Sequence, residues 1–383
     1  MAGILKVDEI SEANQNDGVI LNNTVKVRLD DNSTKTLLST SGSNTTLNNI
    51  TLGSNTIPSS SFMFRNKIIN GGMQIAQRGT TGTTPNTVNY LLDRFSLIRL
   101  GGYPDNLTQT QESDSPTGHS KSLKMIRNSS HTLTGTHASA LTYIVEGNDI
   151  YHLDWGSSTA KAVTISFWVK SNQIGNFPLI LADSNNAFDI GKLYTISNVN
   201  TWEHKTIFIE GPTSGTFNTD NTVGFYIYWG FGAIDSSRTA QGSTWGVSNS
   251  SSTSKAMVSG ASTALATDSG ASFQITGVQL EEGTVATPFE HRPIGIELGL
   301  CQRYFEVGKI YFNAQYSTVT YKVTKRATPT IVITQSSSWT SGAVGTVAYT
   351  STGSGISPDK NNFVLSNPNG AHVGASWTSS AEL

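Results

Sequence analysis

The sequence predicts an all-β protein with an extended N-terminal segment, a sandwich domain, a short helix and a small C-terminal β-domain. Charged residues make up 14% and hydrophobic residues 36% of the 383 residues, and both shares are below those of ordinary globular proteins. Aromatic residues still reach 9%, whereas disordered chains are usually rich in charge and poor in aromatics. The many Gly, Ser, Thr and Asn residues are typical of short strands joined by turns.

Residues 1–60 are predicted to be an extended β segment through which several chains associate. No Phe, Trp or Tyr precedes Phe62, so each strand here has too little apolar surface to offset the entropy lost on ordering. Either this segment is disordered, or its strands pack between chains about a symmetry axis. The regular alternation of turns and short apolar runs favours the second alternative. These runs are Val19–Leu21, Val25–Leu29, Leu37-Leu38 and Ile50–Leu52.

Residues 61–292 are predicted to form a jelly-roll sandwich. Apolar and polar side chains alternate along residues 163–169, which is the period of a strand with one buried face. Similar short runs occur later and are separated by Gly- and Ser-rich loops, a pattern typical of sandwiches and jelly rolls. Trp168 and Trp202 are expected to be buried in the core of this domain.

Residues 293–308 are predicted to form a connecting helix that contacts other subunits. Pro293 suits the first turn and Gly308 is placed to end the helix. The apolar stripe is wider than the surface of a monomer requires, which favours contact between helices of different subunits. Cys301 is expected to be a buried thiol. The candidate interface residues are Ile294, Leu298, Cys301 and Phe305.

Residues 309–383 are predicted to form a small C-terminal β-domain, a possible receptor-binding tip. A unit of roughly 75 residues is marginal as an isolated domain, so association would stabilise it as well. The predicted strands are Thr318–Thr324, Thr330–Thr334, Val344–Tyr349 and Asn362–Leu365.

Several motifs stand in a characteristic order along the chain. They are Arg65–Gly79, Leu92–Phe95, Ser166–Ser171, Trp245, Ile275–Arg292 and Glu297–Phe305. This series resembles bacteriophage tail fibre proteins with a carbohydrate-binding-module-like jelly roll. The resemblance implies a homotrimer in the virion tail that contacts a glycan or another receptor of the bacterial envelope. Gly3–Asp8 looks like the start of some phage virion proteins, which implies that residues 1–60 attach to other phage tail proteins.

The same motifs also have a structural interpretation. Asn70-Gly71-Gly72 is a turn signal at the entry to the sandwich. Gln77-Arg78 and Asp93-Arg94 are predicted to form a buried polar network that fixes the first strand. Glu281-Glu282-Gly283 is predicted to end the last strand.

Catalysis is not expected, although a glycan depolymerase is the sharpest alternative function. Glycoside hydrolysis needs two carboxyl groups across a cleft. Glu281 and Glu282 would point to opposite faces of a strand, and Asp154 has no evident partner. A further alternative is an architectural virion decoration protein without receptor binding.

The sequence predicts no metal site, no cofactor, no nucleic-acid partner and no membrane insertion. The seven histidines show no zinc-binding spacing, although His131 and His137 could approach each other. A structural calcium is left open, with Asp105, Asp114, Asp183 and Asp189 as oxygen donors. The net charge is −2, so no basic footprint for nucleic acid is present, and no apolar stretch has the length of a membrane span.

Glycan binding is the favoured function. Sugars stack their C–H faces on aromatic rings, while short polar side chains reach their hydroxyl groups. Aromatic residues within Ser-, Thr- and Gly-rich stretches are therefore the candidates, against the alternative that each is a core residue. The candidates are Trp155 and Trp245 in the sandwich and Trp339, Tyr349, His372 and Trp377 in the C-terminal domain.

Overall fold

The computed structural model divides the chain into two compact units, Met1–Arg65 and Asn66–Leu383. It describes strands within residues 11–57 and then residues 64–83, 89–103, 107–233, 240, 242–247, 256–312, 316–338, 356–366 and 373–383. Within these ranges, none of the helices combines the length and the apolarity needed to cross a membrane.

The first unit consists of short antiparallel strand groups. β1 (Ser11–Glu12) pairs with β2 (Val19–Ile20), and β6 (Ile50–Leu52) pairs with β7 (Asn55–Ile57). Between them, β3 (Val25–Arg28), β4 (Thr34–Ser41) and β5 (Asn44–Thr46) form a three-stranded sheet. Each of the four predicted apolar runs overlaps one of these strands. Association of chains through these strands stays a prediction.

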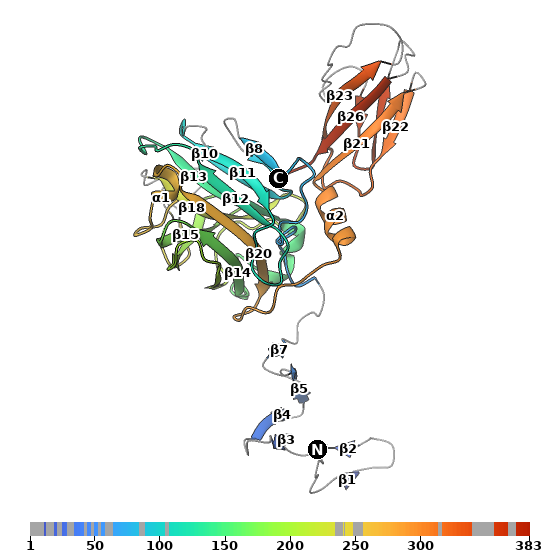
Figure 1. Ribbon diagram of the computed structural model, residues 1–383. Helices are drawn as coiled ribbons and strands as arrows, with labels where there is room; N and C mark the ends of the chain where they lie inside the picture. Colours follow the sequence, from blue (N-terminus) through green and yellow to red (C-terminus); the bar gives the residue numbers. More distant parts are fainter. Residues whose placement is uncertain are drawn as a thin grey trace. The chain divides into compact units, whose positions relative to one another are not determined.

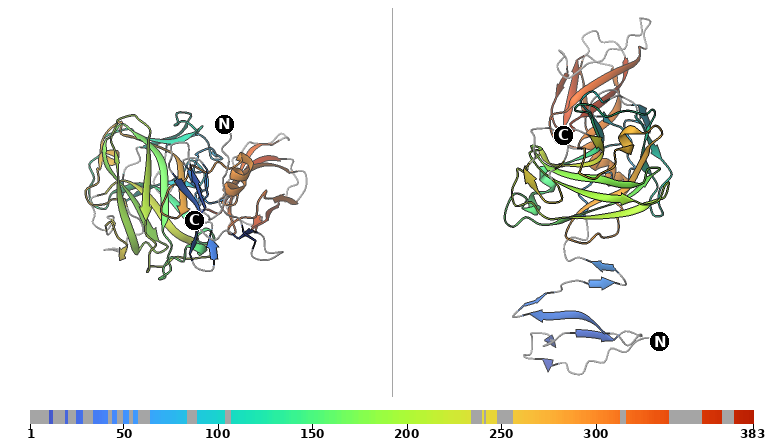
Figure 2. Two further views of the ribbon diagram at one scale, coloured as in Figure 1. Left: turned by 90° about the horizontal axis from the view of Figure 1, so that it is seen from below. Right: turned by 90° about the vertical axis from the view of Figure 1, so that its left-hand side faces the viewer.

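Two antiparallel sheets face each other in the larger part of the second unit (Figure 1; Figure 2). One sheet has the order β19 (Gly246–Val247), β16 (Phe188–Ile196), β15 (Gly175–Asp183), β18 (Val223–Ala233), β13 (Ala138–Glu146), β10 (Phe95–Leu100), β9 (Asn89–Tyr90). The other has the order β17 (Glu203–Ile209), β14 (Val163–Ser171), β20 (Ser272–Glu282), β12 (Ser122–Arg127), β11 (Leu107–Glu112), β8 (Thr81–Thr83). This is the predicted all-β jelly-roll sandwich.

The core lies between the two sheets and is rich in large aromatic side chains. Phe167 from β14 meets Trp229 from β18 edge to face, with ring centroids 5.9 Å apart, and both side chains are fully buried. Phe95 from β10 packs beside Tyr143 from β13 at 5.0 Å. Aromatic side chains bury a large area each, so they dominate the stabilisation of such a core. Short helical turns lie in the connections between strands: η1 (Gly147–Asp149), η2 (Tyr151–Leu153) and α1 (Ala264–Thr267).

The connecting helix α2 (Ile294–Gln302) follows Pro293 as predicted but ends earlier than predicted. The strand β21 (Phe305–Phe312) begins almost immediately, so Phe305 and Gly308 belong to a strand. Gly308 has a different role from ending a helix. A Cβ at this position would lie 2.4 Å from Cζ2 of Trp377, so the missing side chain lets the indole ring lie against the strand.

The face of α2 that carries Cys301 packs against its own chain. Cys301 is fully buried, as predicted, in a cluster with Ile69, Ile75 and Tyr304. Phe305 is also buried, so neither residue lies where another subunit could contact it; this corrects their assignment as interface candidates. Leu298 is half-buried against the same cluster. Ile294 has 57% of its side chain exposed, and only this candidate is largely accessible.

Two small sheets form the C-terminal domain (Figure 1). One contains β21, β26 (Val373–Ser380) and β23 (Thr330–Ser338), and the other contains β22 (Tyr316–Thr320), β25 (Asn362–Ser366) and β24 (Ile356–Pro358). The predicted strands at 330–334 and 362–365 are confirmed. The strand predicted at 318–324 ends at Thr320, and Val344–Tyr349 lies outside the described residues.

The predicted polar network at the entry of the sandwich is confirmed. Gln77 Nε2 donates to Asp93 Oδ1 at 2.7 Å, and Arg78 lies 3.7 Å from the same carboxylate. The network also reaches the last residues of the chain, because Arg78 and Arg94 both pair with Glu382. The first strands of the sandwich are thereby fixed to the C-terminal domain.

Candidate functional site

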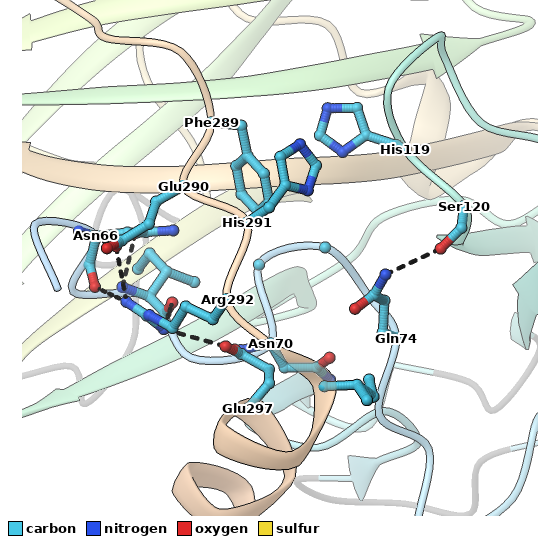
Figure 3. A pocket seen from close by; sticks show the side chains of 14 residues that line it. Asn66, Asn70, Gln74, His119, Ser120, Phe289, Glu290, His291, Arg292 and Glu297 are labelled. Atoms are coloured by element: carbon cyan, nitrogen blue, oxygen red, sulfur yellow. Dashed lines mark hydrogen bonds and ion pairs between the residues drawn. The ribbon is translucent and has the colours of Figure 1, made fainter. Parts of the chain in front are cut away.

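A partly open cavity of about 250 Å³ lies where three segments of the second unit meet (Figure 3). The segments are residues 66–74, residues 119–120 and residues 289–297. The last of these continues into α2, which supplies Glu297. The pocket is thus built from parts of the chain that are far apart in sequence.

The first segment makes a tight turn that forms one side of the pocket. Asn70 has a positive φ of 62°, and its side-chain amide donates to the carbonyl oxygens of Ile75 and Asp93 at 2.9 and 3.0 Å. Gly71 follows and accepts a hydrogen bond from the backbone N–H of Val278 at 3.0 Å. The predicted Asn-Gly-Gly turn is therefore present. Its two glycines leave this side of the pocket without bulky side chains.

The third segment crosses the outer face of β20. The side chain of Gln279 donates to Thr287 at 3.2 Å and accepts from the N–H of Glu290 at 2.8 Å. Glu281 accepts from the N–H of Thr287 at 2.8 Å. Gln279 and Glu281 point away from the core but are buried because this segment covers them. As predicted, β20 ends at Glu282.

Arg292 lines the pocket and joins the first and third segments (Figure 3). Its guanidinium donates to the carbonyl oxygens of Asn66 and Ile68. It also pairs with Glu290 at 3.4 Å and with Glu297 at 3.3 Å. Both carboxylates additionally accept backbone N–H groups, Glu290 from Asn66 and Glu297 from Asn70. Each of these charged groups thus has a partner within the wall.

Three rings line the accessible part of the pocket (Figure 3). The centroid of His119 lies 5.0 Å from that of Phe289 and 5.7 Å from that of His291, and Phe289 and His291 are 5.0 Å apart. Across the pocket, Gln74 Nε2 donates to Ser120 Oγ at 3.0 Å, and both groups are exposed. The pocket therefore combines aromatic faces with uncharged hydrogen-bonding groups.

His119 carries no charge at neutral pH. Burial, together with the nearby His291 and His204, lowers its pKa to about 4. A neutral imidazole presents a ring face and one nitrogen that accepts a hydrogen bond. This arrangement suits a neutral, ring-shaped ligand with apolar C–H faces and hydroxyl groups at its edge.

Two of the aromatic residues singled out from the sequence are buried core residues. Trp155 packs between Phe217 and Phe225 and donates its indole N–H to Lys161 O at 2.8 Å. Trp377 is only 5% exposed and packs on Phe363 at 5.3 Å. Both are corrections, because a buried ring offers no face to a ligand.

The other aromatic candidates have different positions. Trp245 is half-buried and stacks on Phe188, with centroids 5.7 Å apart. Trp168 and Trp202 were expected in the core, but both are only partly buried, which is a further correction. Trp339, Tyr349 and His372 lie outside the described residues.

Sequence reasoning missed the rings that line the pocket. The sequence presents Phe289 and His291 only as part of a folding motif, and His119 only as one of seven histidines without zinc-binding spacing. One signal was available, because Pro288–Arg292 belongs to the segment that carries the family resemblance. No local pattern connects His119 with that segment.

Within the part of the chain that the structure describes, no group of three or more His, Cys, Asp or Glu residues could hold a metal ion. His131 and His137 do approach each other, with Nε2 and Nδ1 3.0 Å apart. The calcium candidate Asp183 accepts backbone N–H groups of Ala187 and Thr216. Asp114 pairs with Lys170, and Asp105 lies outside the described residues.

No family model and no curated protein matches this sequence. Solved structures do show some similarity. The enzymatically active domain of tailspike protein 4 of bacteriophage CBA120 has 14% identity and a TM-score of 0.30, over 57% of this chain and 22% of that chain. A Bacteroides thetaiotaomicron protein described as sugar binding has 10% identity and a TM-score of 0.32, over 57% of this chain and 100% of that chain. TmCBM61 in complex with β-1,4-galactotriose has 10% identity and a TM-score of 0.27, over 57% of this chain and 99% of that chain. At these identities the likeness transfers no residue and no ligand to this chain.

Proposed function

We propose that this chain is a non-catalytic structural subunit of a bacteriophage tail fibre and that its pocket binds a glycan of the bacterial surface. The observation that carries the proposal is the arrangement of Phe289, His119 and His291 around a pocket whose carboxylates are paired with Arg292, with Gln74 and Ser120 opposite. Aromatic faces recognise the C–H groups of sugars, and amide and hydroxyl groups recognise their hydroxyls.

Binding is favoured over hydrolysis because of the state of the pocket carboxylates. A glycosidase needs one carboxyl group to donate a proton and a second to act as base or nucleophile. Glu290 and Glu297 are instead paired with Arg292 and hydrogen-bonded to backbone N–H groups. Both carboxylates therefore have structural partners that compete with a catalytic role.

The assignment to a tail fibre rests on the ordered motifs between residues 62 and 305 and on the composition of residues 1–60. The N-terminal unit has strands but few large side chains, so association into a homotrimer would supply the apolar contacts that one chain lacks. In this proposal residues 1–60 also attach the subunit to other proteins of the phage tail.

A glycan array of purified lipopolysaccharides and capsular polysaccharides tests the binding function. We expect the full chain to bind at least one of them, and Phe289→Ala to reduce that binding. Tyr151→Ala is the matched control, because Tyr151 is exposed and outside the pocket. Loss of binding in the control alone, or no binding to any polysaccharide, contradicts the proposal. Release of reducing sugar from a bound polysaccharide would favour the depolymerase instead.

Light scattering of the full-length protein tests the assembly. The expected mass is three times that of the 41.0 kDa chain. A folded monomer with an ordered N-terminal unit would contradict the fibre. Competition of the purified protein with phage adsorption separates a receptor-binding fibre from a decoration protein, which would not compete.

A further inference from the structure

We propose that the pocket is one end of an aromatic track on the outer face of the six-stranded sheet, and that the ligand is an extended oligosaccharide. The track consists of the pocket rings Phe289, His291 and His119, followed by Trp168 and His204 and then by Trp202. This inference rests on the proposed glycan-binding function and specifies its substrate class.

The middle of the track follows from the alternation along β14. Phe167 and Val169 point into the core and are fully buried, so Trp168 between them points outward. In the sheet register, Trp168 lies opposite His204 of β17 on one side and Thr276 of β20 on the other. The rings of Trp168 and His204 are 5.1 Å apart. Trp168 is half-buried and His204 is exposed, so their ring faces are accessible to a ligand.

Gly277 connects this middle part to the pocket. It has a φ of +62°, and the register between β14 and β20 is irregular at this point. A Cβ on Gly277 would lie 2.6 Å from Cε1 of His119 and 3.1 Å from Cδ1 of Trp168. The two rings therefore flank one glycine, and the absence of a side chain there makes the aromatic surface continuous.

The far end of the track is held by polar contacts. Trp202 Nε1 donates to Asp114 Oδ1 at 3.2 Å, and Lys170 Nζ donates to Asp114 Oδ2 at 2.7 Å. The same ammonium lies 5.9 Å from the Trp202 ring. The lysine and aspartate charges balance each other. This end of the track therefore presents a ring beside a balanced ion pair, which fits a sugar chain better than a charged peptide.

The rings also contact one another along the track. Neighbouring rings are 5.0 to 5.7 Å apart in the pocket and 5.1 Å apart at Trp168 and His204, which is the distance of packed aromatic rings. Further sugars of the same chain would stack on Trp168 and His204 beyond the pocket, and each one would add to the binding free energy.

A chain-length series tests the proposal. The polysaccharide with the strongest signal on the array is partly hydrolysed, and its fragments of increasing length are titrated against the full protein by calorimetry. We expect affinity to rise with length. Trp168→Ala should weaken the long fragments about five- to tenfold and leave the shortest fragment unchanged. Phe289→Ala should weaken both.

His204→Ala is a second variant, because removal of an exposed side chain leaves no cavity in the core. Tyr151→Ala is the control for an exposed ring elsewhere. If affinity depends on Phe289 but not on fragment length, Trp168 or His204, the track is overturned and the pocket remains the binding site. Absence of binding to every polysaccharide overturns the proposed function, and the track with it.

Discussion

Arg94 and Glu382 form a buried ion pair with a nitrogen–oxygen distance of 2.6 Å, although 288 residues separate them. Arg94 also donates to Ile144 O at 2.6 Å, and its guanidinium carbon lies 3.6 Å from the ring centroid of Tyr304. Glu382 in turn pairs with Arg78 at 3.0 Å. One carboxylate near the C-terminus therefore pairs with two arginines at the start of the sandwich, and Asp93 is a second anionic partner of Arg78 at 3.7 Å.

Glu382→Gln should destabilise the protein by roughly 3–5 kcal/mol, because it leaves the fully buried Arg94 without its anionic partner. Urea denaturation measures the change in the free energy of unfolding. Lys161→Ala is the control: its pair with Glu282 at 3.3 Å is 42% and 31% exposed, so the expected loss is at most about 1 kcal/mol. Equal effects of the two substitutions would show that the buried pair has no special structural role.

The sequence predicted those parts of the fold that depend on local periodicity. Along β14, apolar side chains that face the core alternate with side chains that face outward. This alternation can be seen in the sequence without knowledge of the partner strands. The end of α2 was misplaced because Gly308 looked like a helix stop. Its actual role is to accommodate the Trp377 ring from β26, and that contact depends on tertiary structure.

Polar neighbours misled the interpretation of Trp377. Ser376 and Thr378 flank it in β26, and neighbouring residues of a strand point to opposite faces. Polar residues on both sides are thus consistent with a tryptophan that points into the core. The pocket could not be predicted for a related reason, because Asn70, His119 and Phe289 come together only when the sandwich forms.

Gly71 and Gly72 should respond differently to the same substitution. A Cβ on Gly71 would lie 2.1 Å from the carbonyl oxygen of Val278, which is backbone and cannot rotate away. Gly71→Ala should therefore cost about 1–3 kcal/mol. For Gly72 the nearest atoms belong to Phe289 at 3.7 Å, an ordinary contact, so Gly72→Ala should change stability by about 0.5 kcal/mol or less. Thermal and urea unfolding of both variants check this; a tolerated Gly71→Ala would contradict the close approach of this turn to β20.

His119 should make the protein less stable in mild acid. Its pKa is lowered from 6.5 to about 4 by burial and by the neighbouring His291 and His204. As the pH falls from 6.5 towards 4, the unfolded chain takes up a proton that the folded chain does not, so folding stability decreases across this window. Above this pH window, His119 contributes nothing to the pH dependence of folding stability.

The variant His119→Gln should remove this contribution. Urea titrations at several pH values are expected to give a shallower decrease of stability in acid for the variant than for the parent protein. The two curves should run parallel above about pH 7. Identical slopes in the acidic range would mean that His119 takes up its proton as readily in the folded protein as in the unfolded chain, which would contradict a neutral imidazole in the pocket.

Cys301 offers a direct measure of how firmly α2 is fixed to the sandwich. The thiol is fully buried, and burial, together with the charges of Asp93 and Glu297, raises its pKa well above the usual value. Because the thiolate is the reactive form, labelling by a disulfide reagent should require local opening of the structure.

We expect almost no labelling of the native protein and complete labelling in denaturant, with free glutathione as the reference for an accessible thiol. Glu382→Gln should accelerate labelling under native conditions, because the C-terminal contacts that close over Arg94 are weakened. Labelling of the parent protein at the glutathione rate would show that the helix is not packed as described.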